Sequence, residues 1–167
     1  MHSPEENEIN KEKDISLVKY ACDLAVENIE NGGGPFGCVI TDSDYNIIGT
    51  GCNRVTAEND PTLHAEMVAI KNACKNRNAF HLQDCRLYTS CEPCPMCLSA
   101  IYWAHIPVVI YGNTKNDAKS IGFDDSFIYD EIQKPNDERK IHMQHLEPEY
   151  AKCGFISWEN HKSRIHY

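Results

Sequence analysis

His64 and Glu66 lie in one short segment of the chain, and Cys94 and Cys97 lie about thirty residues further on. One imidazole and two thiolates form a ligand set that favours zinc. Three protein ligands leave one position of a tetrahedral zinc ion open for water, whose pKa the metal lowers. Because Glu66 is not needed as a ligand, we assign its carboxylate to proton transfer. The spacing therefore predicts a catalytic zinc site.

Two other interpretations use the same cysteines. Cys91 could join His64, Cys94 and Cys97 in a closed structural site that has no open position. Alternatively, Cys94 and Cys97 have the spacing of a redox pair, but a redox site would leave His64 and Glu66 without a role. We favour the catalytic site because Cys91 precedes the second motif by enough residues to point elsewhere.

Helices alternate with strands in the segments that must position these residues. The expected helices cover residues 15–30, 61 onward, 95–104 and 147–158, and the expected strands cover residues 38–40, 47–50, 85–89 and 107–111. This alternation predicts an α/β fold, a three-layer α/β/α sandwich around one mixed sheet of about five strands. The metal ligands then fall at helix N-termini, where the partial positive charge stabilises thiolates.

Length and composition indicate one domain without a membrane anchor. We expect residues 1–14 to form a flexible leader and residues 15–167 to form the domain. The nine cysteines are odd in number and lack the spacing of a disulfide scaffold, so we expect a cytoplasmic protein. The net charge of −9 argues against a nucleic-acid partner, and no apolar stretch is long enough to span a membrane.

Several segments of the chain, between about residues 20 and 134, resemble the small zinc-dependent guanine deaminases of bacterial type. The zinc motif by itself identifies only the cytidine-deaminase-like superfamily, whose nucleobase deaminases share this ligand set. The more specific matches are Gly34–Gly37, Asn59–Thr62, Tyr88–Cys94, Ala100–Ala104 and, above all, Gly122–Tyr129.

The resemblance implies roles for further residues and a partner. It implies that His64, Cys94 and Cys97 hold zinc and that Glu66 carries protons. It assigns substrate contacts to Phe36, Asn53, Trp103, Asp124, Asp125 and Tyr167. It also implies a homodimer in which the C-terminal segment, about residues 135–167, is exchanged between subunits. The residue types alone leave other roles open: a turn for Asn53, core packing for the aromatic residues, and a solvated acidic turn for the two aspartates.

The expected activity is hydrolysis of guanine, a small-molecule purine, to xanthine and ammonia. Carboxylates and an amide suit the N–H groups and the carbonyl along the edge of guanine. The alternatives within the same class are a guanosine deaminase and a deaminase of cytosine or of adenosine in tRNA. Outside the enzyme class, the alternative is a zinc-stabilised interaction module.

Overall fold

The computed structural model describes residues 10–167, so residues 1–9, most of the predicted leader, lie outside the described residues. The chain divides into a unit that ends at Asp125 and a second unit, Ser126–Tyr167. None of the described helices is both long enough and apolar enough to cross a bilayer.

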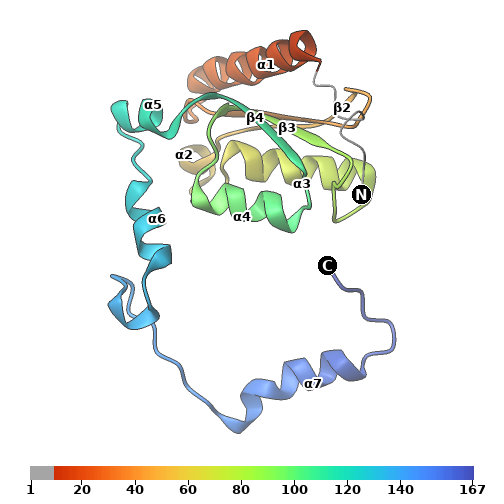
Figure 1. Ribbon diagram of the computed structural model, residues 1–167, viewed down its shortest axis with the longest axis vertical. Helices are drawn as coiled ribbons and strands as arrows, with labels where there is room; N and C mark the ends of the chain where they lie inside the picture. The colour runs from red at the N-terminus through yellow and green to blue at the C-terminus, as the bar shows by residue number, and fades with distance from the viewer. Residues whose placement is uncertain (1–9) are drawn as a thin grey trace. The chain divides into compact units, whose positions relative to one another are not determined.

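The first unit is built around one mixed sheet (Figure 1). Its strands are β1 (Gly37–Thr41), β2 (Ile47–Cys52), β3 (Arg86–Cys91) and β4 (Val108–Asn113), in the order β2-β1-β3-β4. β1 is antiparallel to β2 and β3, and β4 is parallel to β3. The predicted α/β/α sandwich is confirmed, with four strands rather than about five.

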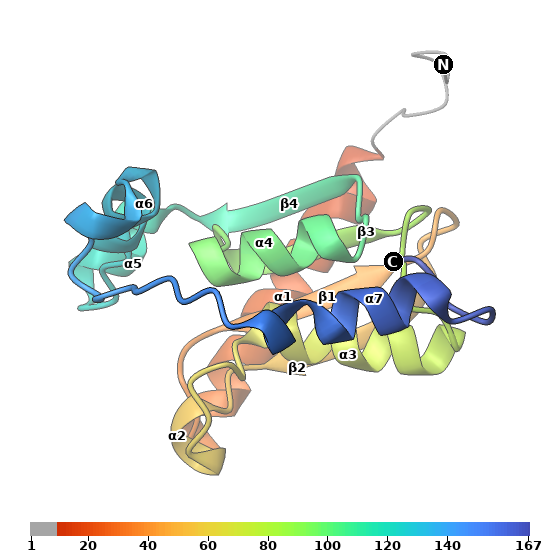
Figure 2. The same cartoon turned by 90° about the horizontal axis from the view of Figure 1, so that it is seen from below.

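Helices cover both faces of this sheet, with α1 (Lys11–Glu30) on one side and α3 (Ala65–Arg77) and α4 (Pro95–Trp103) on the other (Figures 1 and 2). The central strand β1 is buried along its whole length. Its side chains alternate between faces: Cys38 and Ile40 join the core beneath α3 and α4, whereas Val39 joins the core beneath α1. Because both faces of this strand are buried, its sequence does not alternate between apolar and charged residues.

α1 begins at Lys11, four residues before the predicted start. The side chain of Asn10 caps the helix by accepting a hydrogen bond from the backbone N–H of Lys13. Asp14 is buried and accepts a hydrogen bond of 2.7 Å from the hydroxyl of Tyr88. The predicted boundary between leader and domain at residue 14 therefore falls inside a helix that packs on the sheet.

The prediction that the second helix starts at Pro61 is wrong, because α3 starts at Ala65 with His64 as its N-cap residue. The carboxylate of Asp60 accepts hydrogen bonds from both the backbone N–H and the hydroxyl of Thr62. This local turn competes with helix formation and delays the start of the helix by four residues. Between β2 and α3 lies the short helix α2 (Val55–Glu58), which was not predicted.

The remaining helices lie after the sheet. They are α5 (Lys115–Ser120) in the first unit, and α6 (Ser126–Gln133), η2 (Asn136–Glu138), η3 (Glu149–Lys152) and α7 (Cys153–Asn160) in the second. The helix predicted over residues 147–158 is thus a 3₁₀ turn followed by α7. Thr114 and Asp117 form a capping box that starts α5 directly after β4, so β4 is the last strand of the sheet among the described residues.

Candidate active site

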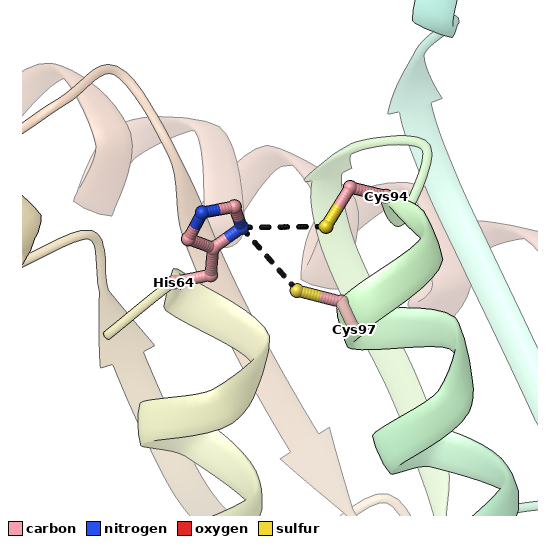
Figure 3. Close-up of side chains that lie close together, drawn as sticks. All are labelled: His64, Cys94 and Cys97. Carbon is pink, nitrogen blue, oxygen red and sulfur yellow. Dashed lines mark hydrogen bonds between the residues drawn. The ribbon is translucent and has the colours of Figure 1, made fainter. Parts of the chain in front are cut away.

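His64, Cys94 and Cys97 come together where the N-termini of α3 and α4 face each other (Figure 3). His64 precedes the first residue of α3, Cys94 precedes the first residue of α4, and Cys97 lies in the first turn of α4. The Nδ1 atom of His64 lies 3.4 Å from the Sγ of Cys94 and 3.5 Å from the Sγ of Cys97. The three donor atoms lie within 4.8 Å of one another. Two sulfurs and one imidazole nitrogen at this spacing fit a zinc ion.

The charges at the cluster also suit a metal. The thiol of Cys97 donates a hydrogen bond to the sulfur of Cys94. This hydrogen bond lowers the pKa of Cys94 to about 4, and His64 contributes further, although burial acts in the opposite direction. The pKa of Cys97 is raised because it keeps the shared proton and is buried. The hydrogen bond with Cys94 raises the pKa of His64. One sulfur is therefore already a thiolate at neutral pH, the form that binds metals.

Glu66 lies in the first turn of α3 and is buried directly beside the cluster. Its Oε2 atom lies 3.4 Å from the Sγ of Cys97. Burial raises the pKa of the Glu66 carboxyl above its usual value. A carboxyl group whose pKa is moved toward neutrality can both accept and return a proton, which is the behaviour predicted for this residue.

Cys91 does not belong to the cluster, because its thiol donates to the backbone carbonyl of Thr114 at 3.6 Å. Burial raises its pKa to about 11, so it remains a thiol. Among the described residues, only His64, Cys94 and Cys97 form a group of three or more candidate metal ligands. The geometry thus supports three protein ligands and an open fourth position rather than a closed structural site.

Phe36 and Asn53 are two predicted substrate contacts that lie side by side. Phe36 directly precedes β1, and Asn53 directly follows β2. The backbone N–H of Asn53 donates to the carbonyl of Phe36 at 3.1 Å, which extends the pairing of the two strands. Asn53 is buried, and its side-chain Oδ1 accepts from the backbone N–H of Val55. Because this oxygen is engaged within the protein, the Nδ2 atom is the group that Asn53 can offer to a ligand as a donor.

The acidic loop that follows α5 is held over the same region by Phe123. The rings of Phe123 and Phe36 meet edge to face, with their centroids 4.9 Å apart. Asp124 forms an ion pair of 2.9 Å with Lys119. Burial raises the pKa of Asp125, and the nearby Cys94 thiolate raises it further. The charge of Asp125 therefore interacts with Cys94 of the cluster.

Phe123 had not been predicted as a site residue, although it opens the Phe-Asp-Asp sequence of the most specific matching segment. Its contact with Phe36 joins two loops that are far apart in the sequence. The signal was therefore present in that segment, but the pairing of the two rings becomes visible only in the fold.

The structure does not bring Trp103 to the cluster within one chain. Trp103 ends α4, nine residues after Cys94, and 66% of its surface is exposed. A helix rises about 1.5 Å per residue, which separates the two residues by roughly 13 Å along the axis. Tyr167 is exposed and belongs to the second unit.

Comparison with known proteins identifies the family. The family model for the zinc-binding region of cytidine and deoxycytidylate deaminases matches residues 11–113. Guanine deaminase of Bacillus subtilis is 50% identical over 153 residues, which cover 91% of this chain and 97% of that protein. The X-ray structure of the B. subtilis guanine deaminase matches the structure of this chain with a TM-score of 0.88 over the same shares of the two chains. The chain belongs to the zinc-dependent guanine deaminase family.

Other members of this deaminase group are more distant. A structure described as a guanine deaminase from Nitrosomonas europaea is 28% identical, with a TM-score of 0.64, and the match covers 75% of this chain and 66% of that one. A tRNA-specific adenosine deaminase of Haemophilus influenzae is 36% identical over 114 residues, 68% of this chain and 66% of that protein. The guanine deaminase family thus accounts for more of this chain than the tRNA deaminase does. Zinc is the cofactor of this deaminase domain, which agrees with the donor set of the cluster.

Proposed function

We propose that this protein is an aminohydrolase that converts guanine and water to xanthine and ammonia. The observation that carries the proposal is the buried Glu66 carboxyl, whose Oε2 lies 3.4 Å from the Sγ of Cys97 beside a cluster that offers two sulfurs and one nitrogen to a metal. The 50% identity to a guanine deaminase over nearly the whole chain supports guanine as the substrate.

The residues of the chain divide the work of the reaction. His64, Cys94 and Cys97 would hold the zinc ion, which supplies a Lewis acid that lowers the pKa of water at the open position. Glu66 would take the proton that the attacking water gives up. It would then donate that proton to a purine ring nitrogen and assist the departure of the amino group as ammonia. The raised pKa of the Glu66 carboxyl suits this two-way transfer.

Donors and acceptors around the site suit the edge of guanine. Asn53 offers its Nδ2 donor, since its Oδ1 is held by Val55, and so matches a carbonyl or ring-nitrogen acceptor. Asp125 offers carboxylate oxygens, which match the N–H donors of guanine. Phe36 supplies an aromatic surface for the flat base, with Phe123 behind it. Asp124 is engaged by Lys119, so we assign it to holding the loop.

A substrate panel tests the proposal. Ammonia release is measured for guanine, guanosine, adenine, cytosine and cytidine with the zinc-loaded protein. We expect turnover of guanine to exceed that of every other compound. Turnover of guanosine without turnover of guanine would refute the proposed substrate. If none of the five compounds is turned over and zinc removal unfolds the chain, the zinc-stabilised interaction module is favoured instead.

We further propose that the protein is a homodimer that exchanges its C-terminal segment. No side chain of the helices in the second unit is buried, and exposed apolar residues recur along this unit, including Tyr150, Phe155 and Tyr167. α4 also exposes an apolar face that includes Tyr102 and Trp103. Apolar surface of this kind is typical of protein interfaces. In such a dimer, Trp103 belongs to the interface rather than to the pocket wall of its own chain.

All nine cysteines are free, which supports a reducing compartment such as the cytoplasm.

Complementation between two inactive variants tests the exchange. If Tyr167 of one chain closes the site of its partner, a mixed dimer of Glu66→Gln and Tyr167→Ala chains contains one site in which both residues are native. Co-refolding the two variants should then restore up to half of the activity per dimer. If each chain closes its own site, every site in the mixed dimer carries a substitution, and no activity is gained.

A further inference from the structure

Asn28 is a buried polar residue near the end of α1, on an element that carries none of the predicted site residues. Only 4% of its surface is exposed. Its Nδ2 group donates two hydrogen bonds, one of 2.9 Å to the carbonyl of Gly34 and one of 2.7 Å to the carbonyl of Asn53. Its own backbone carbonyl accepts a hydrogen bond of 3.0 Å from the N–H of Gly33. One side-chain amide thus joins the end of a helix to two loops.

These two loops carry the two purine contacts assigned above. Gly34 leads directly to Phe36, and Asn53 is itself the predicted hydrogen-bonding residue. The packing leaves little room for adjustment. A Cβ atom built on Gly33 would lie 2.2 Å from the Nδ2 of Asn28 and 2.3 Å from the carbonyl oxygen of Asn53. A Cβ atom on Gly34 would lie 3.1 Å from the Oδ1 of Asn53. The loops therefore close tightly around the amide of Asn28.

Asn53 is held at three points as a result. Asn28 binds its carbonyl, the carbonyl of Phe36 binds its N–H, and the N–H of Val55 binds its side-chain oxygen. The first of these contacts comes from α1, and the third comes from the first residue of α2. Because the hydrogen bonds to the carbonyls of Gly34 and Asn53 need two donors on one atom, an amide nitrogen provides them where a carboxylate or an alkyl group cannot.

We propose that Asn28 is a positioning residue for guanine binding, acting through Asn53 and Phe36. The identity of the ligand rests on the proposed function. The positioning role itself rests on the hydrogen bonds of Asn28 to Gly34 and Asn53. A shift of about 1 Å in a binding group can cost on the order of 100-fold in rate. Loss of the Asn28 amide therefore affects guanine recognition and leaves the zinc ligands, on α3 and α4, in place.

A double-mutant cycle tests whether Asn28 acts through Asn53. We expect Asn28→Ala to lower kcat/KM for guanine by roughly 10- to 100-fold, mainly through a higher KM, at unchanged zinc content. In an Asn53→Ala background the same substitution should cost clearly less, since the Asn53 side chain is gone and only the link to Phe36 remains. Asn28→Asp, which keeps the shape and removes both donors, should repeat the loss and serves if Asn28→Ala does not fold.

Asn76→Ala is the matched control. The Nδ2 of Asn76 also donates to a backbone carbonyl, that of Ile48, at 2.8 Å, but at the end of β2 away from the site. We expect this variant to keep the wild-type kcat/KM. An equal loss for Asn28→Ala in both backgrounds would show a merely structural role and overturn the proposal.

Amide hydrogen exchange supplies a readout that does not depend on activity. Exchange at the N–H of Asn53 should become at least several-fold faster in the Asn28 variants and stay unchanged in Asn76→Ala. Unchanged exchange in the Asn28 variants would overturn the positioning role whatever the turnover. Faster exchange in a protein whose wild type does not act on guanine would instead contradict the proposed function and support the link between Asn28 and the loops.

Discussion

Gly51 lies where β2 passes the start of α3, and a single added methyl group there tests how closely the site depends on that packing. A Cβ atom at Gly51 would lie 2.2 Å from the carbonyl oxygen of Ala65 and 2.5 Å from the backbone nitrogen of Ala69. Such contacts essentially never fall below 3.0 Å, so β2 and α3 must separate by about 0.8 Å or more. His64 and Glu66 flank Ala65 and must move with it.

The displacement gives the magnitude expected for Gly51→Ala. A misplacement near 1 Å costs on the order of 100-fold, so kcat/KM for guanine should fall by roughly that factor. Overpacking costs about 1–3 kcal/mol, which for a chain of this length lowers Tm by roughly 3–10 °C. Steady-state kinetics and calorimetry of the zinc-loaded protein measure the two effects.

Gly49→Ala is the control on the same strand. Its Cβ atom would lie 2.7 Å from the backbone nitrogen of Ala73 and 2.8 Å from the carbonyl of Ala69, further along α3 from the metal ligands. It should lower Tm as well, but kcat/KM by no more than about 3-fold, because the start of α3 stays in place. Wild-type activity in Gly51→Ala, or equal loss in both variants, would refute the reasoning.

Three further predictions concern the metal cluster and the core. Cys91→Ala should retain about one zinc per chain by elemental analysis, since the thiol of Cys91 binds a backbone carbonyl outside the cluster. Loss of zinc in this variant would instead support the closed structural site with Cys91 as a fourth ligand. Zinc binding to the metal-free protein at pH 7 should release at least one proton per metal, because Cys94, with a pKa of about 4, is already a thiolate whereas Cys97 keeps its proton. Affinity should accordingly fall as pH falls, and calorimetry in two buffers of different ionisation enthalpy that shows no proton release would contradict this. Tyr88→Phe should lower Tm by several degrees, at a cost of about 1–3 kcal/mol, because Asp14 loses its partner and its other carboxylate oxygen already has none; an unchanged Tm would refute it.

The metal cluster could be predicted because its chemistry is local in the sequence. His64 and Glu66 are two residues apart and Cys94 and Cys97 are three apart, so each pair lies within one helical turn wherever that helix goes. The alternation of helices and strands then brings the two N-termini to one side of the sheet. The start of α3 could not be placed correctly, because the turn made by Asp60 and Thr62 outcompetes the helix signal of Pro61.

Longer-range features escaped prediction for a different physical reason. The partners of the Asn28 side chain are backbone carbonyls 6 and 25 residues away, and no residue type marks such acceptors. The contact between Phe36 and Phe123 likewise depends on where two loops meet. The resemblance assigned Trp103 to the pocket, and it did not reveal that Trp103 lies at the far end of α4, nine residues after Cys94.

The most direct test of the account is the comparison of the wild type with Glu66→Gln for zinc content and for xanthine formation from guanine. We expect about one zinc per chain in both proteins, because Glu66 is not a ligand. Turnover should be present in the wild type and fall by roughly 100- to 10,000-fold in the variant, the usual range for loss of a general acid and base. Full turnover in Glu66→Gln at equal zinc content would contradict the central claim.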